Sequence, residues 1–536
     1  MAEPFNAAEY LVHRHGVEGR GDHVAVEGSK QTLTYDGLGQ LIKRVGAGYR
    51  ALGLRHDDRI MMVMSDDVPM LAAIIGAFHA GVVAVPVSTM FNPDELGKIL
   101  GDSGARALVC TEEFADTVAT ALDHATDVEH VIHVGDPGTL GDGAASVRAW
   151  DDFLGSESDT TPAEPTTDDH WALWLYTSGT TGQPKAAMHR HANIRHVCET
   201  YGQQVLGITP EDRTLSVAKM FFAYGIGNTV FFPFSVGATT ILEPRRPTPQ
   251  VVAERVSQGE PSLFFGVPTF YAALVASDIT DDTFASVRLA ASAGEPLPAP
   301  LQEKFTRRFG VEILDGIGST EALHIFLSNR PDDIRPGTTG QAVPGYDVEI
   351  RDESGAVAEA GEPGALYVRG QSIALGYWHR TDATRQVFQG EWLSTGDTYI
   401  RDEQGYYRCL GRNTDMLKAG GIWVSPSEVE SRLLEHASVR QAAVVGVPDA
   451  DGLDKPVAAV VIEGGTTPEE LIAWCREGLA HFKAPRRVIV VDDLPKTATG
   501  KLQRYLVRDL MVDGREDAEP PTTTAAEAAD VAGAPS

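Results

Sequence analysis

Helix-like windows alternate with short apolar runs along the first part of the chain, and this alternation limits the fold more than any other feature. Residues 36–52 and 94–103 have helical periodicity, whereas residues 59–64, 82–87 and 107–110 are apolar or β-branched runs of strand length. Such alternation is typical of βαβ units, in which helices cover a largely parallel sheet. The sequence therefore predicts an α/β fold.

The length of the chain and changes in its residue pattern predict more than one domain. The chain has 536 residues, and single cores stop growing at roughly 250 to 300 residues. From about Gly337, short strand-like segments separated by Gly, Pro and Asp predict a smaller antiparallel β module. Residues 413–510, with helical windows at 427–434 and 468–479, predict a separate α+β domain. Residues 512–536, rich in Ala, Thr, Pro and carboxylates, predict a disordered acidic tail.

Net charge, cysteine spacing and hydropathy narrow the class of protein. The formal net charge of −30 argues against nucleic acid and anionic membrane surfaces as partners, because both would be repelled. The four cysteines are widely separated, which predicts neither a zinc site nor a disulfide framework. The most apolar window, 70–87, is interrupted by His79, Gly and Pro, and predicts a buried helix, a turn and a buried strand. We expect a cytoplasmic protein with no membrane partner and no export signal.

The stretch YTSGTTGQPK, residues 176–185, is rich in glycine and hydroxyl side chains and ends on a single lysine. It follows the apolar run WALWLY and precedes a helix-like segment, a setting in which backbone N–H groups can close around a phosphate. Lys185 would neutralise part of a polyphosphate. The spacing differs from that of a Walker A loop, because only two residues separate Gly179 from Gly182. On composition alone, a flexible surface loop remains the alternative.

This stretch resembles the phosphate-binding signature of the adenylate-forming enzymes, which include acyl- and aryl-CoA synthetases, peptide-synthetase adenylation domains and firefly-type luciferases. Five further motifs follow in the order of that superfamily: SAGEPL (292–297), DGIGSTE (315–321), STGD (394–397), GRNTDMLKAGGIWVSPSEVE (411–430) and PKTATGKLQR (495–504). The resemblance implies an N-terminal domain, residues 1–411, that holds the ATP and carboxylate sites. It also implies a mobile C-terminal domain, residues 412–511, followed by the tail.

The resemblance implies a two-step reaction that uses ATP, Mg²⁺ and coenzyme A. A carboxylate attacks the α-phosphate of ATP to give an acyl-AMP and pyrophosphate, and the thiol of coenzyme A then takes the acyl group. The implied catalytic residues are Lys185, Glu321 and Lys501, of which Lys501 would bridge the entering carboxylate and the α-phosphate. Glu321, with the Thr180 hydroxyl, would hold the metal, since hard oxygen ligands suit Mg²⁺. Without the resemblance, Glu321 is also interpretable as an acid at a helix start and Lys501 as a solvated surface lysine.

Further residues are assigned to ATP and coenzyme A by the same motifs. Asp397 would accept hydrogen bonds from the ribose hydroxyls with the help of Arg412, although an Asp after a Gly is more often a turn residue. Thr414 stands near a hinge position that usually holds Asp or Lys in this superfamily. The other cofactor-binding residues implied are Thr177, Ser178, Gly179, Thr180, Thr181, Gly182, Gly294, Asp315, Gly316, Thr320, Lys418, Gly420 and Gly421.

The segments KMFFAYGIGN (219–228) and GIGSTEALHIF (316–326) look most similar to those of benzoate-CoA ligases within the superfamily. Flat aromatic walls with a polar histidine suit a planar ring, although aromatic runs more often fill a core. We predict an ATP-dependent ligase that joins benzoate or a substituted benzoate to coenzyme A. The alternatives are a ligase for a cinnamate-type or medium-chain acid and a non-catalytic adenylate-binding relative; a homodimer is left open. The predicted acid-binding residues are Phe222, Ala223, Tyr224, Gly225, Ile317, Gly318 and His324.

Overall fold

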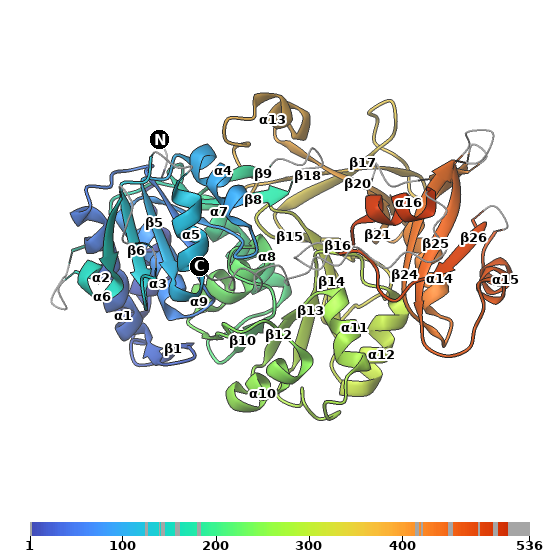
Figure 1. Ribbon diagram of the computed structural model, residues 1–536, viewed down its shortest axis with the longest axis horizontal. Helices are drawn as coiled ribbons and strands as arrows, with labels where there is room; N and C mark the ends of the chain where they lie inside the picture. Colours follow the sequence, from blue (N-terminus) through green and yellow to red (C-terminus); the bar gives the residue numbers. More distant parts are fainter. Residues whose placement is uncertain are drawn as a thin grey trace, which may run out of the picture. The chain divides into compact units, whose positions relative to one another are not determined.

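The computed structural model describes residues 3–123, 127–138, 140, 145–155, 161–178, 184–412, 417–419, 422–448, 454–480, 483–496 and 502–512. The chain divides into two compact units, Met1–Arg408 and Cys409–Ser536. The first unit contains mixed sheets flanked by helices and the second is a smaller α+β unit, as Figure 1 shows. The predicted fold class is therefore confirmed.

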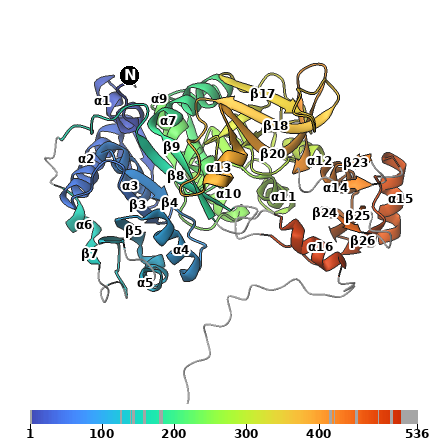
Figure 2. The ribbon, with the colours of Figure 1, turned by 90° about the horizontal axis from the view of Figure 1, so that it is seen from above.

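A seven-stranded sheet in the order β7-β6-β5-β3-β4-β8-β9 forms one half of the first unit. All neighbouring strands in it are parallel except the last pair, β8 and β9. Helices α4 and α5 lie beside β5 (Figure 2). Their apolar side chains share a core with the strands. Its strands are β3 (Arg59–Val63), β4 (Val83–Pro86), β5 (Ala107–Thr111), β6 (His130–Val134), β7 (Ser146–Ala149), β8 (Trp171–Ser178) and β9 (Pro184–Arg190).

Capping side chains and left-handed glycines mark the ends of helices in this half. In α4, the Asn92 side chain accepts from Glu95 N while Glu95 reaches back to Asn92 N, and Gly104 (φ 56°) follows the last residue. The apolar window 70–87 forms the end of α3, a turn at Gly81 (φ 70°) and β4, as predicted. No helix in the described ranges is long and apolar enough to cross a membrane. The helices are α2 (Tyr35–Ala51), α3 (Val68–Ala80), α4 (Pro93–Ser103), α5 (Ala115–Leu122) and α6 (Trp150–Phe153).

A nine-stranded sheet in the order β16-β15-β14-β13-β12-β10-β11-β1-β2 forms the other half. The strands from β1 to β14 in this order are parallel, so the carboxyl ends of β12, β13 and β14 lie at one edge. Phe264, Tyr271, Phe284 and Phe305 build a core under α10, α11 and α12. The strands are β1 (Val24–Glu27), β2 (Thr32–Thr34), β10 (Arg213–Ser216), β11 (Thr239–Ile241), β12 (Leu263–Gly266), β13 (Leu289–Ser292), β14 (Ile313–Gly318), β15 (Ile325–Ser328) and β16 (Gln341–Ala342).

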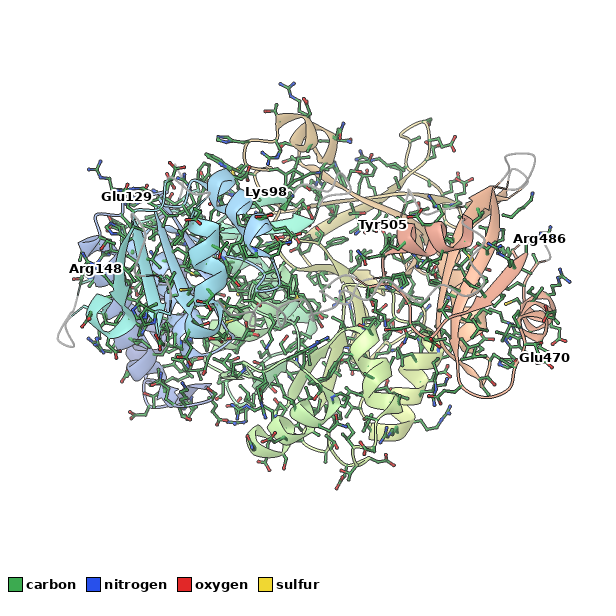
Figure 3. All side chains as sticks on the ribbon, viewed as in Figure 1. Lys98, Glu129, Arg148, Glu470, Arg486 and Tyr505 are labelled. Carbon is green, nitrogen blue, oxygen red and sulfur yellow. The ribbon has the colours of Figure 1, made fainter. Side chains whose placement is uncertain are left out.

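Charged side chains such as Lys98, Glu129 and Arg148 lie on the surface of the first unit (Figure 3).

The other connections of the first unit contain both regular and π-helical segments. The remaining helices are α1 (Arg14–Val17), α7 (His191–Val197), α8 (Ala223–Ile226), α9 (Phe232–Val236), α10 (Pro249–Gly259), α11 (Pro268–Ala276) and α12 (Ala299–Phe309), with π-helical η1 (Glu9–His13), η4 (Cys198–Val205) and η5 (Gly227–Phe231) and the 3₁₀ turn η2 (Glu112–Phe114).

The predicted antiparallel module completes the first unit. Strands β17 (Tyr346–Arg351), β18 (Pro363–Gly370), β20 (Trp392–Arg401) and β19 (Phe388–Gln389) pair in that order, each antiparallel to its neighbour. Helix α13 (Thr381–Val387) precedes β19. The change of residue pattern near Gly337 thus precedes a separate, wholly antiparallel sheet that starts at Tyr346.

The second unit has two cores on opposite faces of one sheet. Successive residues of β24 alternate between them: Val444 packs with Val429 and Leu471, whereas Val445 packs with Val507 and Met511. The three-stranded sheet has the order β24-β25-β26, and β22 pairs with β23. Its elements are β22 (Leu417–Ala419), β23 (Ile422–Val424), α14 (Pro426–Leu434), β24 (Val439–Pro448), β25 (Asp454–Ile462), α15 (Pro468–Gly478), β26 (Arg487–Val490) and α16 (Arg504–Val512), and the unit boundary falls within β21 (Tyr407–Arg412).

Candidate active site

The predicted phosphate stretch belongs to a β-hairpin. Strands β8 and β9 are antiparallel neighbours (Figure 1). Thr177 pairs with Lys185, and the last described pair of the hairpin is Ser178 with Pro184. The helix predicted after this stretch is α7, which begins at His191, but the placement of the stretch between a strand and a helix is wrong, because β9 intervenes. Of the predicted residues, Gly179, Thr180, Thr181 and Gly182 lie outside the described residues.

Lys185 and Glu321 both contact the side chain of one tyrosine. The Nζ atom of Lys185 is 5.5 Å from the ring centroid of Tyr377. The Tyr377 hydroxyl donates a hydrogen bond of 2.6 Å to Oε1 of Glu321. Glu321 lies in the turn between β14 and β15, so the interpretation of this residue as an acid at a helix start is wrong. Our sequence analysis missed Tyr377, because nothing in its neighbourhood signals a contact with a residue 56 positions away.

Asp397 lies inside β20 and not at the end of a strand. The pairing of β18 with β20 shifts register between Ala365 and Tyr367, and this irregularity spans residues 395–397 of β20. Gly396 has φ 77°, a left-handed conformation that favours glycine. Asp397 is 7% exposed. A bulge therefore sets the position of this carboxylate, in the way that bulges often re-aim a side chain.

The motif residues after β13 and on β14 gather at the carboxyl edge of the nine-stranded sheet. Ser292, the last residue of β13, pairs with Asp315 on β14. Burial raises the pKa of the Asp315 carboxyl well above its usual range, although backbone N–H groups of Gly316 and Leu297 act in the opposite direction. Gly294, just beyond β13, has φ 94°. The carboxyl edges of parallel strands are where α/β sheets bind ligands.

Thr320 and Gly318 connect this edge to neighbouring elements. The carbonyl oxygen of Thr320 is 2.8 Å from Nε2 of His189, a ring whose pKa burial lowers to about 4. A Cβ atom on Gly318 would overlap the carbonyl group of His324. Only glycine fits this position, because the chain turns back on itself between β14 and β15.

Tyr224 and His324, two of the predicted acid-binding residues, lie together. Their ring centroids are 5.4 Å apart with an interplanar angle of 36°, and the Tyr224 hydroxyl donates to Ala291 O at 3.0 Å. His324 is 2% exposed, and burial lowers its pKa to about 3, so the ring is neutral near neutral pH. Phe222 directly precedes α8, and its ring centroid lies 4.6 Å from that of Phe221. The remaining predicted residues are Ala223 and Gly225 on α8 and Ile317 on β14.

Two aromatic residues that our sequence analysis did not select complete the surroundings of His324. The rings of Tyr201 and Phe232 have centroids 5.4 and 4.5 Å from the His324 ring. A Cβ atom on Gly227 would overlap Cδ2 of His324. These contacts come from η4, η5 and α9, and only the fold brings them to the turn after β14.

A shallow hollow lies beside the start of the 219–228 segment, and none of the predicted acid-binding residues lines it. Lys219 is one of its lining residues and donates from Nζ to the carbonyl oxygens of Glu243 and Arg245, at 2.6 and 3.0 Å. Because these backbone contacts engage the ammonium group, we assign this hollow no part in binding the acid.

The second unit contributes fewer described site residues. Arg412 ends β21, and Lys418 lies on β22, where it pairs with Trp423. Four predicted residues lie outside the described residues: Thr414, near the predicted hinge, Gly420, Gly421 and Lys501. Residues 513–536 also lie outside them.

The side-chain oxygens described here are better suited to Mg²⁺ than to a metal ion whose ligands are mostly protein side chains. Within the described part of the chain, no three His, Cys, Asp or Glu side chains gather as a metal cluster. Glu321 offers a carboxylate whose Oε1 is held by Tyr377. Mg²⁺ typically binds one or two carboxylates together with water and substrate phosphates, so the single carboxylate of Glu321 is compatible with it.

Comparison with known proteins identifies the class. The family model for the AMP-binding enzyme matches residues 13–378, and that for the AMP-binding enzyme C-terminal domain matches residues 428–501. The chain belongs to the AMP-binding enzyme family, and the resemblance stated from the sequence motifs is confirmed.

Individual relatives match over nearly the whole chain. The benzoate–CoA ligase of Thauera aromatica is 42% identical, over 95% of this chain and 96% of that protein. The 4-hydroxybenzoate–CoA/benzoate–CoA ligase of Rhodopseudomonas palustris is 39% identical, over 96% of both. Among solved structures, a benzoate CoA ligase from Burkholderia xenovorans LB400 has a TM-score of 0.86 at 41% identity, covering 94% of this chain and 100% of that one. The anthranilate CoA ligase AuaEII, in complex with anthranoyl-AMP, has a TM-score of 0.89 at 36% identity, covering 95% and 98%.

Proposed function

We propose that this protein is an AMP-forming aryl-CoA ligase that activates benzoate or a substituted benzoate and transfers the acyl group to coenzyme A. The contact between Tyr224 and His324, at the turn after β14, is the observation that carries the choice of acid. Full-length similarity to benzoate–CoA ligases supports the same choice. The protein would act in the cytoplasm on small molecules.

The predicted acid-binding residues suit an uncharged, planar ring. Two aromatic faces can pack on such a ring, and pairs of this kind contribute about 0.5–1.5 kcal/mol beyond the area that they bury. His324 is neutral because burial lowers its pKa to about 3, so it offers a hydrogen-bonding group without a charge. Its Nδ1 atom has no hydrogen-bond partner among the described groups, which would allow a contact with a ring substituent. A long flexible acyl chain would gain less from these flat walls.

The nucleotide would lie between the β8–β9 hairpin and the carboxyl edge of the nine-stranded sheet. In the first step, a carboxylate oxygen of the acid bonds to the α-phosphorus, and the bond from that phosphorus to the bridging oxygen of pyrophosphate breaks. Lys185 and the loop N–H groups would stabilise the charge on the leaving pyrophosphate. Glu321, with Thr180, would hold Mg²⁺, which when bound neutralises phosphate charge. Asp397 and Arg412 would bind the ribose, and Asp315 and Gly316 would also contribute to the nucleotide site.

The C-terminal domain, which we place at residues 412–511, would supply Lys501 for adenylation. We propose that the domain then turns so that Lys418, Gly420 and Gly421 face the path of coenzyme A. The thiol of coenzyme A would attack the acyl carbon, and AMP would leave with the bonding electrons of the acyl–oxygen bond. The tail, predicted as residues 512–536, has no part in this scheme. The predicted start of the tail is wrong by one residue, because Val512 is the last residue of α16.

Acid-dependent release of pyrophosphate tests this proposal. Benzoate and hydroxy- or aminobenzoates should be activated far better than acetate, cinnamate or medium- and long-chain fatty acids. Related aromatic acids should still be used to some extent, because one misfitted methylene changes the transition-state energy by only about 1–3 kcal/mol. A preference for a fatty acid would refute the choice of acid, and the absence of pyrophosphate release with any acid would favour a non-catalytic adenylate-binding protein.

A further inference from the structure

A short segment of the first unit, residues 374–378, is hydrogen-bonded to both of the elements that carry the predicted charges. Ala374 N donates to the carbonyl oxygen of Glu321 at 2.8 Å. At the other end, Trp378 N donates to the carbonyl oxygen of Ala186, the residue after Lys185, at 3.0 Å. The segment therefore fixes the main chain of the carboxylate residue relative to the strand that carries the lysine.

The side chain of Tyr377 makes the second link between the same two residues. Its hydroxyl donates to Oε1 of Glu321 at 2.6 Å, a length typical of a strong hydrogen bond to an ionised acceptor. The Nζ atom of Lys185 lies 5.5 Å from the ring centroid, which is within the range of a cation–π contact. Tyr377 is only 7% exposed, so water screens these contacts little.

The position of Tyr377 is itself well supported. Tyr377 N donates to Oγ1 of Thr384 at 3.0 Å, and its ring meets that of Phe388 edge-on at 5.3 Å. The ring is also buried with Ala187 and Ala374. Packing alone would be satisfied by phenylalanine, so the hydroxyl contributes something that the core does not need.

We propose that Tyr377 is a positioning residue that keeps Glu321 and Lys185 apart and correctly oriented for ATP. Within the described residues, no ion pair joins Lys185 to Glu321, although the two side chains have opposite charges and contact the same ring. A direct pair would neutralise both groups. The ring contacts the lysine and the hydroxyl holds one carboxylate oxygen, so that the other oxygen is left for the metal and the lysine is left for phosphate. This inference rests on the proposed function for the roles of the two charged residues.

Two substitutions separate the parts played by the hydroxyl and the ring. Tyr377→Phe keeps the ring and removes the hydrogen bond, whereas Tyr377→Leu also removes the aromatic face. Binding of ATP, measured by calorimetry without any carboxylic acid, reports on positioning without turnover. With Mg²⁺ present, Tyr377→Phe should bind ATP about 10- to 100-fold more weakly, the range expected for the loss of one hydrogen bond to a charged group. With EDTA in place of Mg²⁺, its affinity should match that of the wild type, whereas Tyr377→Leu should lose affinity under both conditions.

Further measurements distinguish positioning from general stability. Tyr35→Phe is a matched control, because it removes a buried tyrosine hydrogen bond, to Ala238 O at 2.6 Å, and should leave ATP binding unchanged. In a Glu321→Gln background, Tyr377→Phe should have little additional effect on ATP binding with Mg²⁺. Transfer of the acyl group from supplied benzoyl-AMP to coenzyme A should proceed at the wild-type rate in Tyr377→Phe.

Two results would overturn the inference. One is wild-type ATP affinity with Mg²⁺ in a folded Tyr377→Phe protein. The other is an equal loss of affinity with Mg²⁺ and with EDTA, accompanied by a lower melting temperature, because that pattern marks a purely structural role. Since no acid is present, a wrong choice of acid in the proposed function would leave these binding results unaffected, and it would be recognised separately by the pyrophosphate assay.

Discussion

Replacing Gly227 by alanine should push a methyl group against the ring of His324. Gly227 has φ −60° and ψ −50°, so alanine can adopt its backbone conformation. The new Cβ atom, however, would lie 2.7 Å from Nε2 of His324 and would overlap Cδ2, whereas ordinary van der Waals contacts lie at 3.4–4 Å. The ring also packs against Tyr201, Tyr224 and Phe232, so a displacement of the ring should change the surroundings of the acid that we place beside it.

The size of the effect follows from two opposing terms. Overpacking a tight core costs about 1–3 kcal/mol. Replacing glycine by alanine where the backbone conformation is compatible returns roughly 0.4–1 kcal/mol through the unfolded state. The free energy of unfolding should therefore fall by about 1–2 kcal/mol. If the displaced ring costs a similar amount in the transition state for adenylation, kcat/KM for benzoate should fall about 10-fold.

The assay is pyrophosphate release at varied benzoate and at varied ATP, together with urea unfolding. We expect the loss in kcat/KM for benzoate, with the KM for ATP unchanged. Gly101→Ala is the matched control, because Gly101 lies in α4 with nothing within 4 Å of the methyl group that alanine would add, and this change should leave the kinetics unaltered. Unchanged benzoate kinetics in a Gly227→Ala protein that is measurably destabilised would refute the assignment of His324 to the acid site.

Three further changes test other parts of the site. Lys185→Ala should raise the KM for ATP and slow pyrophosphate release while the melting temperature stays within a few degrees of wild type; unaltered ATP kinetics would remove Lys185 from the phosphate site. Lys501→Ala should slow adenylation on the order of 10² to 10³-fold, as for loss of one transition-state charge contact, and leave acyl transfer from supplied benzoyl-AMP nearly normal; equal losses in both half-reactions would contradict the proposed domain rotation. His324 has a pKa of about 3 in the folded protein against 6.5 as its ordinary value, so protonation favours the unfolded state. The contribution of His324 to the free energy of unfolding should therefore be complete above pH 6.5 and decline toward pH 3. In His324→Gln, the free energy of unfolding measured with urea should fall less between about pH 7 and pH 4.5 than in the wild type. An equal fall in both proteins would contradict this.

Periodicity and local end signals predicted the regular elements of the fold well. The expected helix at 94–103 is α4, whose start is marked by Asn92 and Glu95 and whose end is marked by Gly104. The parallel strands were predictable for a related reason, since strands buried on both faces are continuous apolar runs. Motif order then identified the superfamily, because six short patterns in register specify far more than any one of them.

Features that depend on distant parts of the chain were not predictable in this way. The segment PKAAMHR forms β9, but its two alanines show no clear alternation, and its pairing with β8 decides its conformation. Asp397 follows a left-handed glycine as turn residues do, yet the partner strand β18 makes this glycine part of a bulge. The contacts of Tyr377 with Lys185 and Glu321 join three separate segments, and no local pattern contains them.

The two cores of the second unit have a consequence for the cost of any domain motion. Because β24 contributes side chains such as Val444 and Val445 to opposite faces, helices α14 and α15 cover one face of the sheet and α16 covers the other. Each apolar face is thus shielded by elements of the same unit. If this unit turns between the two half-reactions as we propose, neither core needs to open to water. The free-energy cost of turning would then be set by the connecting chain and by surface contacts, which are exchanged more cheaply than buried apolar area.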